Sequence, residues 1–246
     1  MSKGYAVVTG AGRSIGAALA RQLGKEGYDV LINYSSSSQK AEEVAQSISQ
    51  DFGVKAVTFK ASVEDYNQVK EMRDFAVETF GEKMVVLVNN AGIMNRKKFV
   101  DMEPDEYARV IGVDLFGTLN CCNLFVPLMI KQNFGRVITI ASTAGLRGSI
   151  DQSDYCAAKG AQIAFTRAVA LEWGQYNITA NVIAPGFIMT EGTAELGPQL
   201  EARIRSQSPL GQVGSVDDMA QALSYLINSD IMTGQTISPN CGVFMF

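Results

Sequence analysis

The chain has 246 residues, of which 47% are hydrophobic and 19% are charged, and its formal net charge is −4. This composition supports a sizeable core and argues against disorder, while the weakly negative charge gives no reason to expect nucleic acid or an anionic membrane as a partner. The sequence contains no histidine, which excludes a Ser-His-Asp hydrolase, a Cys-His protease and a His-ligated zinc site.

Short apolar runs alternate with helical patterns along the whole chain. The predicted strands cover residues 5–10, 29–34, 55–61, 84–92, 135–142, 178–185 and 234–239. The predicted helices cover residues 15–26, 39–52, 64–80, 104–131, 153–173 and 217–227. Because the strand segments are apolar along their length, they indicate a parallel sheet covered by helices on both faces. We therefore expect an α/β, Rossmann-like, doubly wound fold, formed as a single domain over residues 1–246.

We find no sequence pattern typical of a secretory signal, a membrane span or a metal site. The N-terminal sequence enters a strand pattern at once, without a visible secretory signal, and no apolar stretch is long enough to span a bilayer. The four cysteines show neither metal-ligand spacing nor a disulfide framework. We therefore predict a cytoplasmic protein with no metal site and no membrane partner.

The first predicted strand runs into a glycine-rich turn, TGAGRSIG, at residues 9–16. Glycines after a first strand allow the backbone to turn tightly and to approach a pyrophosphate, which then binds at the N-terminus of the following helix. The turn does not match G-x-G-x-x-G, and by itself it fits an ordinary βα turn equally well. The candidate cofactor-binding residues of this turn are Gly10, Gly12, Arg13, Ser14, Ile15 and Gly16.

The second predicted strand ends without the carboxylate that binds the ribose hydroxyls of NAD in this fold. Asn33, Tyr34 and Ser35 stand there instead. A carboxylate repels a 2′-phosphate, whereas an amide and hydroxyls donate hydrogen bonds to it. Arg13 adds a charged donor, unless it is simply a solvated loop arginine. We therefore expect NADP(H) as the preferred cofactor, with NAD(H) as the alternative.

Four short motifs lie at or just past the carboxyl ends of different predicted strands. They are Thr9-Gly10, NNAG at 89–92, Ser142 and Pro185-Gly186. Open α/β sheets bind ligands at this edge. Tyr155 and Lys159 begin the helix after the Ser142 strand, and at a spacing of i and i+4 their side chains share one helical face. The sequence thus predicts one site at this edge of the sheet.

With these motifs in place, the chain resembles the single-domain short-chain dehydrogenase/reductase family over essentially its whole length, and it looks most like the 3-oxoacyl-carrier-protein reductase branch. The resemblance implies seven parallel strands, a nicotinamide cofactor and a homo-oligomer, either a tetramer or a dimer, built partly on the two long helices. It also implies the remaining cofactor contacts, which are Ser62, Val63, Asn90, Ala91, Gly92, Tyr155, Lys159, Pro185, Gly186, Ile188 and Thr190.

Reduction of a ketone needs a hydride from the cofactor and a proton for the developing alkoxide. A tyrosine hydroxyl in water has a pKa of about 10 and is a poor proton donor near neutral pH, unless a cation beside it stabilises the tyrosinate. We therefore expect Tyr155 to donate the proton and Lys159 to supply the cation and, by resemblance, to bind the nicotinamide ribose. Ser142 Oγ either holds the carbonyl oxygen of the substrate or bonds nearby backbone. The predicted reaction interconverts a ketone, either an apolar one or a 3-oxoacyl thioester, and its secondary alcohol.

Four positions depart from the family pattern. Ser14 replaces the middle glycine, Ser62 replaces the adenine-contacting Asp, and Cys241 replaces a glycine for a reason that the sequence does not reveal. Asp114 replaces the catalytic Asn, whose main-chain carbonyl in the family holds a water linked to the lysine. We keep Asp114 in the predicted catalytic set and expect it to weaken this relay without abolishing it.

These departures favour an alternative function, a catalytically weak dinucleotide-binding sensor or regulatory protein on the same fold. A third possibility, a hydrolase in which Lys159 activates Ser142, leaves the NNAG motif unexplained.

Three further features of the sequence bear on the substrate and on how it is bound. The places where carrier-protein reductases dock their partner through arginines hold Asn133 and Tyr176 here, which argues against a carrier-protein substrate. The basic NRKK segment at 95–98 either attracts the phosphates of a thioester or forms a solvated loop. Residues 187–210 have the glycines and prolines of a mobile lid over the pocket.

Overall fold

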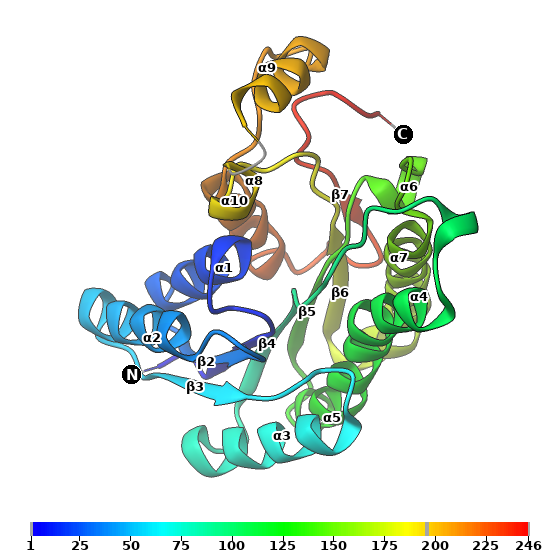
Figure 1. Ribbon diagram of the computed structural model, residues 1–246. Helices are drawn as coiled ribbons and strands as arrows, with labels where there is room; N and C mark the ends of the chain where they lie inside the picture. Colours follow the sequence, from blue (N-terminus) through cyan, green and yellow to red (C-terminus); the bar gives the residue numbers. More distant parts are fainter. Residues whose placement is uncertain (1, 195–196, 246) are drawn as a thin grey trace.

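The computed structural model describes residues 2–194 and 197–245. Its seven strands form one sheet in the order β3-β2-β1-β4-β5-β6-β7, and all neighbouring strands are parallel. This confirms the predicted Rossmann-like, doubly wound fold (Figure 1). The strands are β1 (Tyr5–Val8), β2 (Asp29–Tyr34), β3 (Ala56–Lys60), β4 (Met84–Asn89), β5 (Gly135–Ile140), β6 (Ile178–Ile183) and β7 (Thr236–Ile237).

Helices cover both faces of the sheet. Helices α1, α2 and α10 pack on one face, and α3, α5 and α7 pack on the other (Figure 1). The ten helices of the described part are α1 (Ser14–Lys25), α2 (Ser38–Phe52), α3 (Tyr66–Phe80), α4 (Pro104–Ile111), α5 (Gly117–Lys131), α6 (Ala144–Arg147), α7 (Ser153–Trp173), α8 (Glu191–Ala194), α9 (Pro198–Gln207) and α10 (Val216–Ile227).

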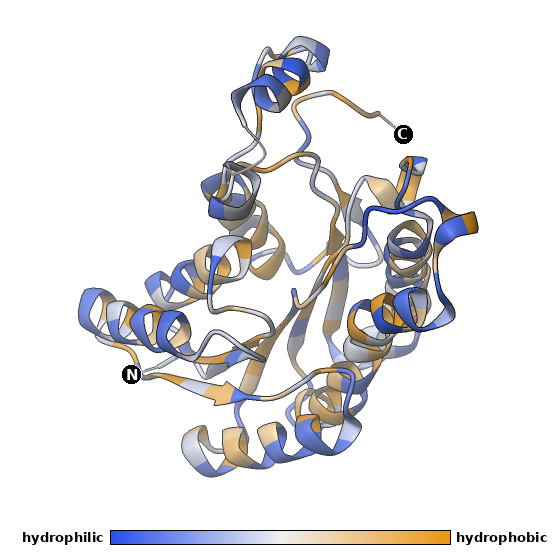
Figure 2. Ribbon diagram, in the orientation of Figure 1, coloured by the Kyte–Doolittle hydropathy of each residue, from blue (hydrophilic) through white to orange (hydrophobic). Residues whose placement is uncertain are grey.

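Burial on both faces explains why the strands are mostly apolar. Successive side chains of a strand point to opposite faces, so Ala6 and Val8 join the core beneath α1 and α10, whereas Tyr5 and Val7 join the core beneath α3 and α5. Figure 2 shows that apolar residues gather on the sheet, while hydrophilic residues lie on the outer faces of the helices.

Several element boundaries differ from the prediction by one to three residues, and two of them have clear local reasons. The predicted strand at 84–92 ends at Asn89, because the next backbone N–H, that of Asn90, donates to the Thr9 hydroxyl and not to a neighbouring strand. The helix predicted from residue 64 begins at Tyr66, because Asp65 caps it: the Asp65 carboxylate accepts hydrogen bonds from the backbone N–H groups of Asn67 and Gln68.

The segment predicted as one helix over 104–131 is helical throughout, with a π-helical turn at Gly112–Phe116 between α4 and α5. The expectation that no apolar stretch could span a bilayer is wrong, because this segment is long and apolar enough by length and composition. Its apolarity has a structural cause in the fold: Leu124, Phe125 and Met129 of α5 are buried in the core that α5 shares with the sheet and α3.

The segment predicted as a lid contains α8 and α9, and α9 projects beyond the carboxyl edge of the sheet beside the C-terminal segment (Figure 1). Ser208, just after α9, donates a hydrogen bond of 3.0 Å from Oγ to the carbonyl oxygen of Cys241. Residues 195 and 196 of the predicted lid lie outside the described residues. The lid and the single-domain organisation both remain predictions.

Candidate active site

The glycine turn after β1 packs directly on the loop after β4. A Cβ on Gly10, whose φ is +62°, would lie 2.9 Å from Ala91 Cα, and a Cβ on Gly16 would lie 2.5 Å from the carbonyl oxygen of Gly10. Asn90 Nδ2 donates hydrogen bonds to the carbonyl oxygens of Thr9 (2.9 Å) and Gly10 (3.1 Å). The structure thus brings two predicted motifs together, and the lack of side chains at Gly10 and Gly16 permits this close packing. The glycine turn lies at the N-terminus of α1, and we call it the glycine cradle, because such a turn fits the pyrophosphate of a dinucleotide.

Asn33, predicted as a cofactor contact, has a structural task. Its side chain is buried; Oδ1 accepts a hydrogen bond from the Gly10 N–H (3.2 Å), and Nδ2 donates one to the Ala61 carbonyl (3.0 Å). The amide therefore ties the end of β2 to the glycine turn and to the end of β3. Tyr34, Ser35 and Arg13 are left as the predicted donors to a 2′-phosphate.

A pair of charged residues that sequence reasoning missed lies beside the glycine turn. Lys40 Nζ on α2 is 2.7 Å from Glu191 Oε2 on α8. The hydrogen bond from Lys40, followed by the charges of Lys40 and Arg13, lowers the pKa of Glu191. The start of α2 lies against the turn itself, because a Cβ on Gly12 would be 3.4 Å from Ala41 Cβ. No local pattern links two residues 151 positions apart.

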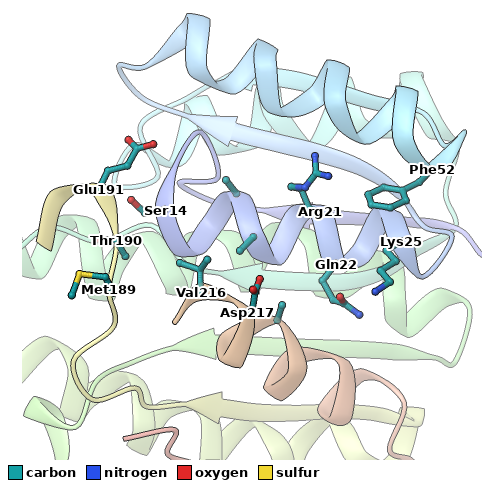
Figure 3. A pocket seen from close by; sticks show the side chains of 13 residues that line it. Ser14, Arg21, Gln22, Lys25, Phe52, Met189, Thr190, Glu191, Val216 and Asp217 are labelled. Carbon is teal, nitrogen blue, oxygen red and sulfur yellow. The ribbon is translucent and has the colours of Figure 1, made fainter. Parts of the chain in front are cut away.

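A cleft of about 850 Å³ runs between α1, α8 and the start of α10. Figure 3 shows Ser14, Thr190 and Glu191 at one end of this cleft and Arg21, Lys25 and Phe52 toward the other. Two predicted cofactor residues, Ser14 and Thr190, therefore share one end of the cleft.

Two departures from the family pattern fall on the same backbone conformation. Ser14 has φ +53° and Cys241 has φ +55°, in the left-handed region that favours glycine. The positive φ at Cys241 explains why the family pattern has a glycine at this position, which the sequence alone did not reveal. The third departure, Ser62, donates a hydrogen bond from Oγ to Glu64 Oε1 (3.3 Å), and Val63 beside it is buried.

The segment after β6 is anchored by its backbone. The carbonyl oxygen of Pro185 accepts a hydrogen bond from the Thr143 N–H, and the Gly186 N–H donates one to Pro239, both at 3.0 Å. A Cβ on Gly186 would lie 2.8 Å from Asn240 Cβ. Ile188, predicted as a cofactor contact, has a buried side chain that belongs to the core beneath α1 and α10.

Ser142 and Tyr155 come from neighbouring elements that meet through small residues. Ser142 follows β5, and its Oγ accepts a hydrogen bond of 3.1 Å from the Ala144 N–H at the start of α6. A Cβ on Gly145 of α6 would lie 2.6 Å from the Gly160 backbone nitrogen, so the absence of one lets α6 rest on α7. Tyr155 lies in the first turn of α7, and its ring centroid is 5.5 Å from Lys159 Nζ.

Lys159 is almost fully buried at the base of the site. Its Nζ donates a hydrogen bond to the Ile140 carbonyl (3.0 Å) and forms an ion pair with Asp114 Oδ2 (3.1 Å). Asp114 is completely buried in the π-helical turn, and its Oδ1 accepts a hydrogen bond from the Ile93 N–H (2.7 Å). Burial raises the pKa of Asp114, and the charge of Lys159 and the Ile93 N–H only partly offset it. Gly92 permits this approach, because a Cβ there would lie 2.9 Å from Asp114 Oδ2.

The main-chain oxygen of Asp114 is also occupied. Gln162 Nε2 donates a hydrogen bond to it at 2.7 Å, and Thr118 Oγ1 donates another at 2.9 Å. Sequence reasoning missed both residues. The only signal for Gln162 is that an amide stands three residues after Lys159 in an otherwise largely apolar helix.

Comparison with known proteins shows the family of this chain. The family model described as short chain dehydrogenase matches residues 4–201. The chain belongs to this family. It is therefore an NAD(P)-dependent oxidoreductase of the short-chain dehydrogenase type, as the sequence predicted.

Curated relatives and a solved structure agree with the predicted branch of this family. The 3-oxoacyl-[acyl-carrier-protein] reductase FabG of Staphylococcus aureus is 38% identical over 242 residues, covering 98% of each chain. The 3-oxoacyl-[acyl-carrier-protein] reductase of Synechocystis is 35% identical over 244 residues, covering 98% of this chain and 97% of the relative. The crystal structure of a 3-oxoacyl-[acyl-carrier protein] reductase from Brucella melitensis superimposes with a TM-score of 0.92 at 30% identity, covering 100% of this chain and 92% of that one.

Proposed function

We propose that this short-chain dehydrogenase is an NADP(H)-dependent reductase that converts a 3-oxoacyl thioester, or a similarly apolar ketone, into its secondary alcohol. The observation that carries the proposal is the arrangement of Ser142, Tyr155 and Lys159 around the end of β5, at the same sheet edge as the glycine cradle. A dinucleotide in that cradle lies at the edge where open α/β sheets bind their ligands.

The nicotinamide cofactor, when bound, supplies the hydride. Ser142 Oγ already accepts the Ala144 N–H, so its own hydrogen is free to donate to the carbonyl oxygen of the substrate. Tyr155 donates the proton to the developing alkoxide, and the ammonium of Lys159 stabilises the tyrosinate that remains. The buried contacts of Lys159 with Ile140 and Asp114 hold its charge at the base of the site.

The preference for NADP(H) rests on the charges around the end of β2. Residues 33–38 contain no carboxylate, while Arg13 and Lys40 both lie close enough to act on Glu191. A 2′-phosphate carries up to two negative charges and suits a site with two cations. Lys40 therefore joins Arg13, Tyr34 and Ser35 as a proposed contact.

The proposed substrate follows from the relatives and from the mouth of the site. The curated relatives are named as 3-oxoacyl-[acyl-carrier-protein] reductases. Met94, in the loop after β4, and Ile150, between α6 and α7, expose apolar surface, which suits an acyl chain. Lys97 of the NRKK segment is paired with Glu106 (2.6 Å), which leaves Arg96 and Lys98 as the exposed cations for a phosphate.

The acyl group of the proposed substrate is bound either to a carrier protein or to coenzyme A. Asn133 and Tyr176 at the predicted docking positions favour coenzyme A. The homo-oligomer remains a prediction from the resemblance, and the cytoplasmic location remains a prediction from the cysteines and the N-terminal sequence.

The first experiment titrates the purified protein with NADPH and with NADH by fluorescence, and then follows NADPH oxidation with a short 3-oxoacyl-coenzyme A and with the matching carrier-protein thioester. Tyr155→Phe should lower kcat by at least about 100-fold while the Kd for NADPH stays within a factor of two. If Tyr155→Phe keeps most of the activity, the proposed proton donor is wrong. If the wild-type protein binds NADPH but turns over no ketone, the regulatory alternative takes its place.

A further inference from the structure

Lys159 has two fixed partners, and one of them is a carboxylate. We propose that Asp114 is a positioning residue, which holds the ammonium of Lys159 through its side-chain carboxylate and, by compensating its charge, sets the pH range in which Tyr155 works. The inference rests on the proposed roles of Tyr155 and Lys159, and it assigns to Asp114 a task that its main-chain carbonyl does not perform in this chain.

The contacts of Lys159 define the geometry. An ammonium has three N–H donors. The Ile140 carbonyl accepts one of them at 3.0 Å, and Asp114 Oδ2 lies 3.1 Å from Nζ as an ion-pair partner. Among the described residues, Oδ2 of Asp114 has no hydrogen-bonding partner besides this ion pair, while Oδ1 is fixed by the Ile93 N–H. The carboxylate is therefore held with one oxygen turned to Lys159.

The main-chain carbonyl oxygen of Asp114 already has its hydrogen-bonding partners. A carbonyl oxygen has two lone pairs, and Gln162 Nε2 and Thr118 Oγ1 occupy both at 2.7 and 2.9 Å. Gln162 Nε2 also donates a hydrogen bond of 2.7 Å to Thr118 Oγ1, so these two side chains hold each other in position. All these groups are buried, and a water molecule at this oxygen would first have to displace one of them.

The charges in this pocket predict the effect on Tyr155. The positive charge of Lys159 favours ionised Tyr155, and a carboxylate 3.1 Å from that charge opposes it. The other ionisable group that acts on Asp114 is Asp154, a buried residue of α7 whose Oδ1 accepts the Tyr155 N–H and whose Oδ2 accepts Asn95 Nδ2. Around Asp114, the loop after β4 presents the Ile93 N–H, α5 presents the Thr118 hydroxyl and α7 presents the Gln162 amide, while the Ile140 carbonyl of β5 faces Lys159. Asp114 is thus the charge nearest to Lys159.

The test uses Asp114→Asn, which keeps the shape of the side chain and an oxygen for the Ile93 N–H but removes the charge. Rates of ketone reduction and of the reverse oxidation are measured from pH 5.5 to 10 at saturating cofactor. With the negative charge gone, tyrosinate is favoured, so the midpoint of both pH profiles should move down by about one pH unit. A merely structural role would change the rate or the stability without moving the midpoint. An unmoved or raised midpoint therefore overturns the proposal.

Gln162→Leu provides an independent arm that does not depend on the folding of the first variant. It frees one lone pair of the Asp114 carbonyl and leaves the carboxylate in place. The pH midpoint should stay within about 0.3 units of the wild type, and kcat should not rise. A kcat raised several-fold means that the carbonyl is the working partner and overturns the proposal. Failure of the proposed function itself is seen separately, as activity retained by Tyr155→Phe.

Discussion

Lys40 on α2 holds Glu191 at the start of α8 by an ion pair of 2.7 Å, across the glycine turn that carries Arg13. Glu191 lies at the end of the cleft that also holds Ser14 and Thr190 (Figure 3), and Lys40 belongs to the helix that follows β2. A carboxylate in this place occupies the same cations that we propose as contacts of a 2′-phosphate. The ion pair therefore bears on cofactor choice more than on stability, because exposed pairs stabilise a fold only weakly.

Glu191→Gln should tighten the binding of NADPH by roughly two- to fivefold and leave NADH nearly unchanged, because it removes a negative charge that competes with the 2′-phosphate. The Kd values come from fluorescence titration at low ionic strength. Lys40→Met is the matched control and should weaken NADPH binding alone. Equal changes for both cofactors would show that the substitution acts on the shape of α8 and not on charge.

Ser14→Gly should stabilise the fold by about 1 kcal/mol, because a left-handed backbone is unfavourable for a residue with a Cβ. The free energy of unfolding is measured in urea, without cofactor. Cys241→Gly meets the same backbone condition at φ +55° and should act in the same direction. A loss of stability in Ser14→Gly would mean that the serine hydroxyl makes a contact worth more than the strain.

Arg136 is a buried cation in β5 whose contribution to the fold can be separated from that of its carboxylate partner. Its guanidinium donates hydrogen bonds to the carbonyls of Gly135 and Ile227, lies over the Phe134 ring at 4.3 Å, and pairs with Asp230, which is 82% exposed. Arg136→Ala should lower the free energy of unfolding by about 3 kcal/mol or more, through lost packing and stranded carbonyls. Asp230→Ala should lower it by only about 1 kcal/mol or less. Similar losses in the two variants would place the stabilisation in the ion pair.

The cysteines should divide into two pairs by reactivity. Burial raises the pKa of Cys122 to about 12 and also raises that of Cys121 well above its usual range, so both thiols stay protonated at pH 8. Iodoacetamide should modify only the partly exposed Cys156 and Cys241 in the native protein, and all four residues in urea. Peptide mass spectrometry reads out the modified sites. Labelling of Cys121 in native protein would show that the face of α5 opens in solution.

Much of the architecture was predictable, because burial leaves a regular trace in the chain. Strands covered on both faces are buried along their length and mostly apolar, as in β4 and β5, and parallel strands bring their carboxyl ends to one edge. The glycine turn, the NNAG motif, Ser142 and the Tyr155–Lys159 face could therefore be placed at one site before any coordinates. The 104–131 segment was misjudged for the same reason, since apolarity shows that a helix is covered but not by what.

The sequence by itself determined the order of the elements, the edge at which the site lies and the residue types available there. Only the tertiary structure decided which of those residues meet. The Asp114–Lys159 ion pair, the Gln162 contact with the Asp114 carbonyl and the Lys40–Glu191 pair each join residues from different elements. Local periodicity reflects neighbours within a turn or a strand, whereas these contacts depend on how helices and loops pack across the sheet edge. The left-handed backbone at Ser14 and Cys241 belongs with them, because it arises from the path that the packed chain must follow and not from the residue in that place.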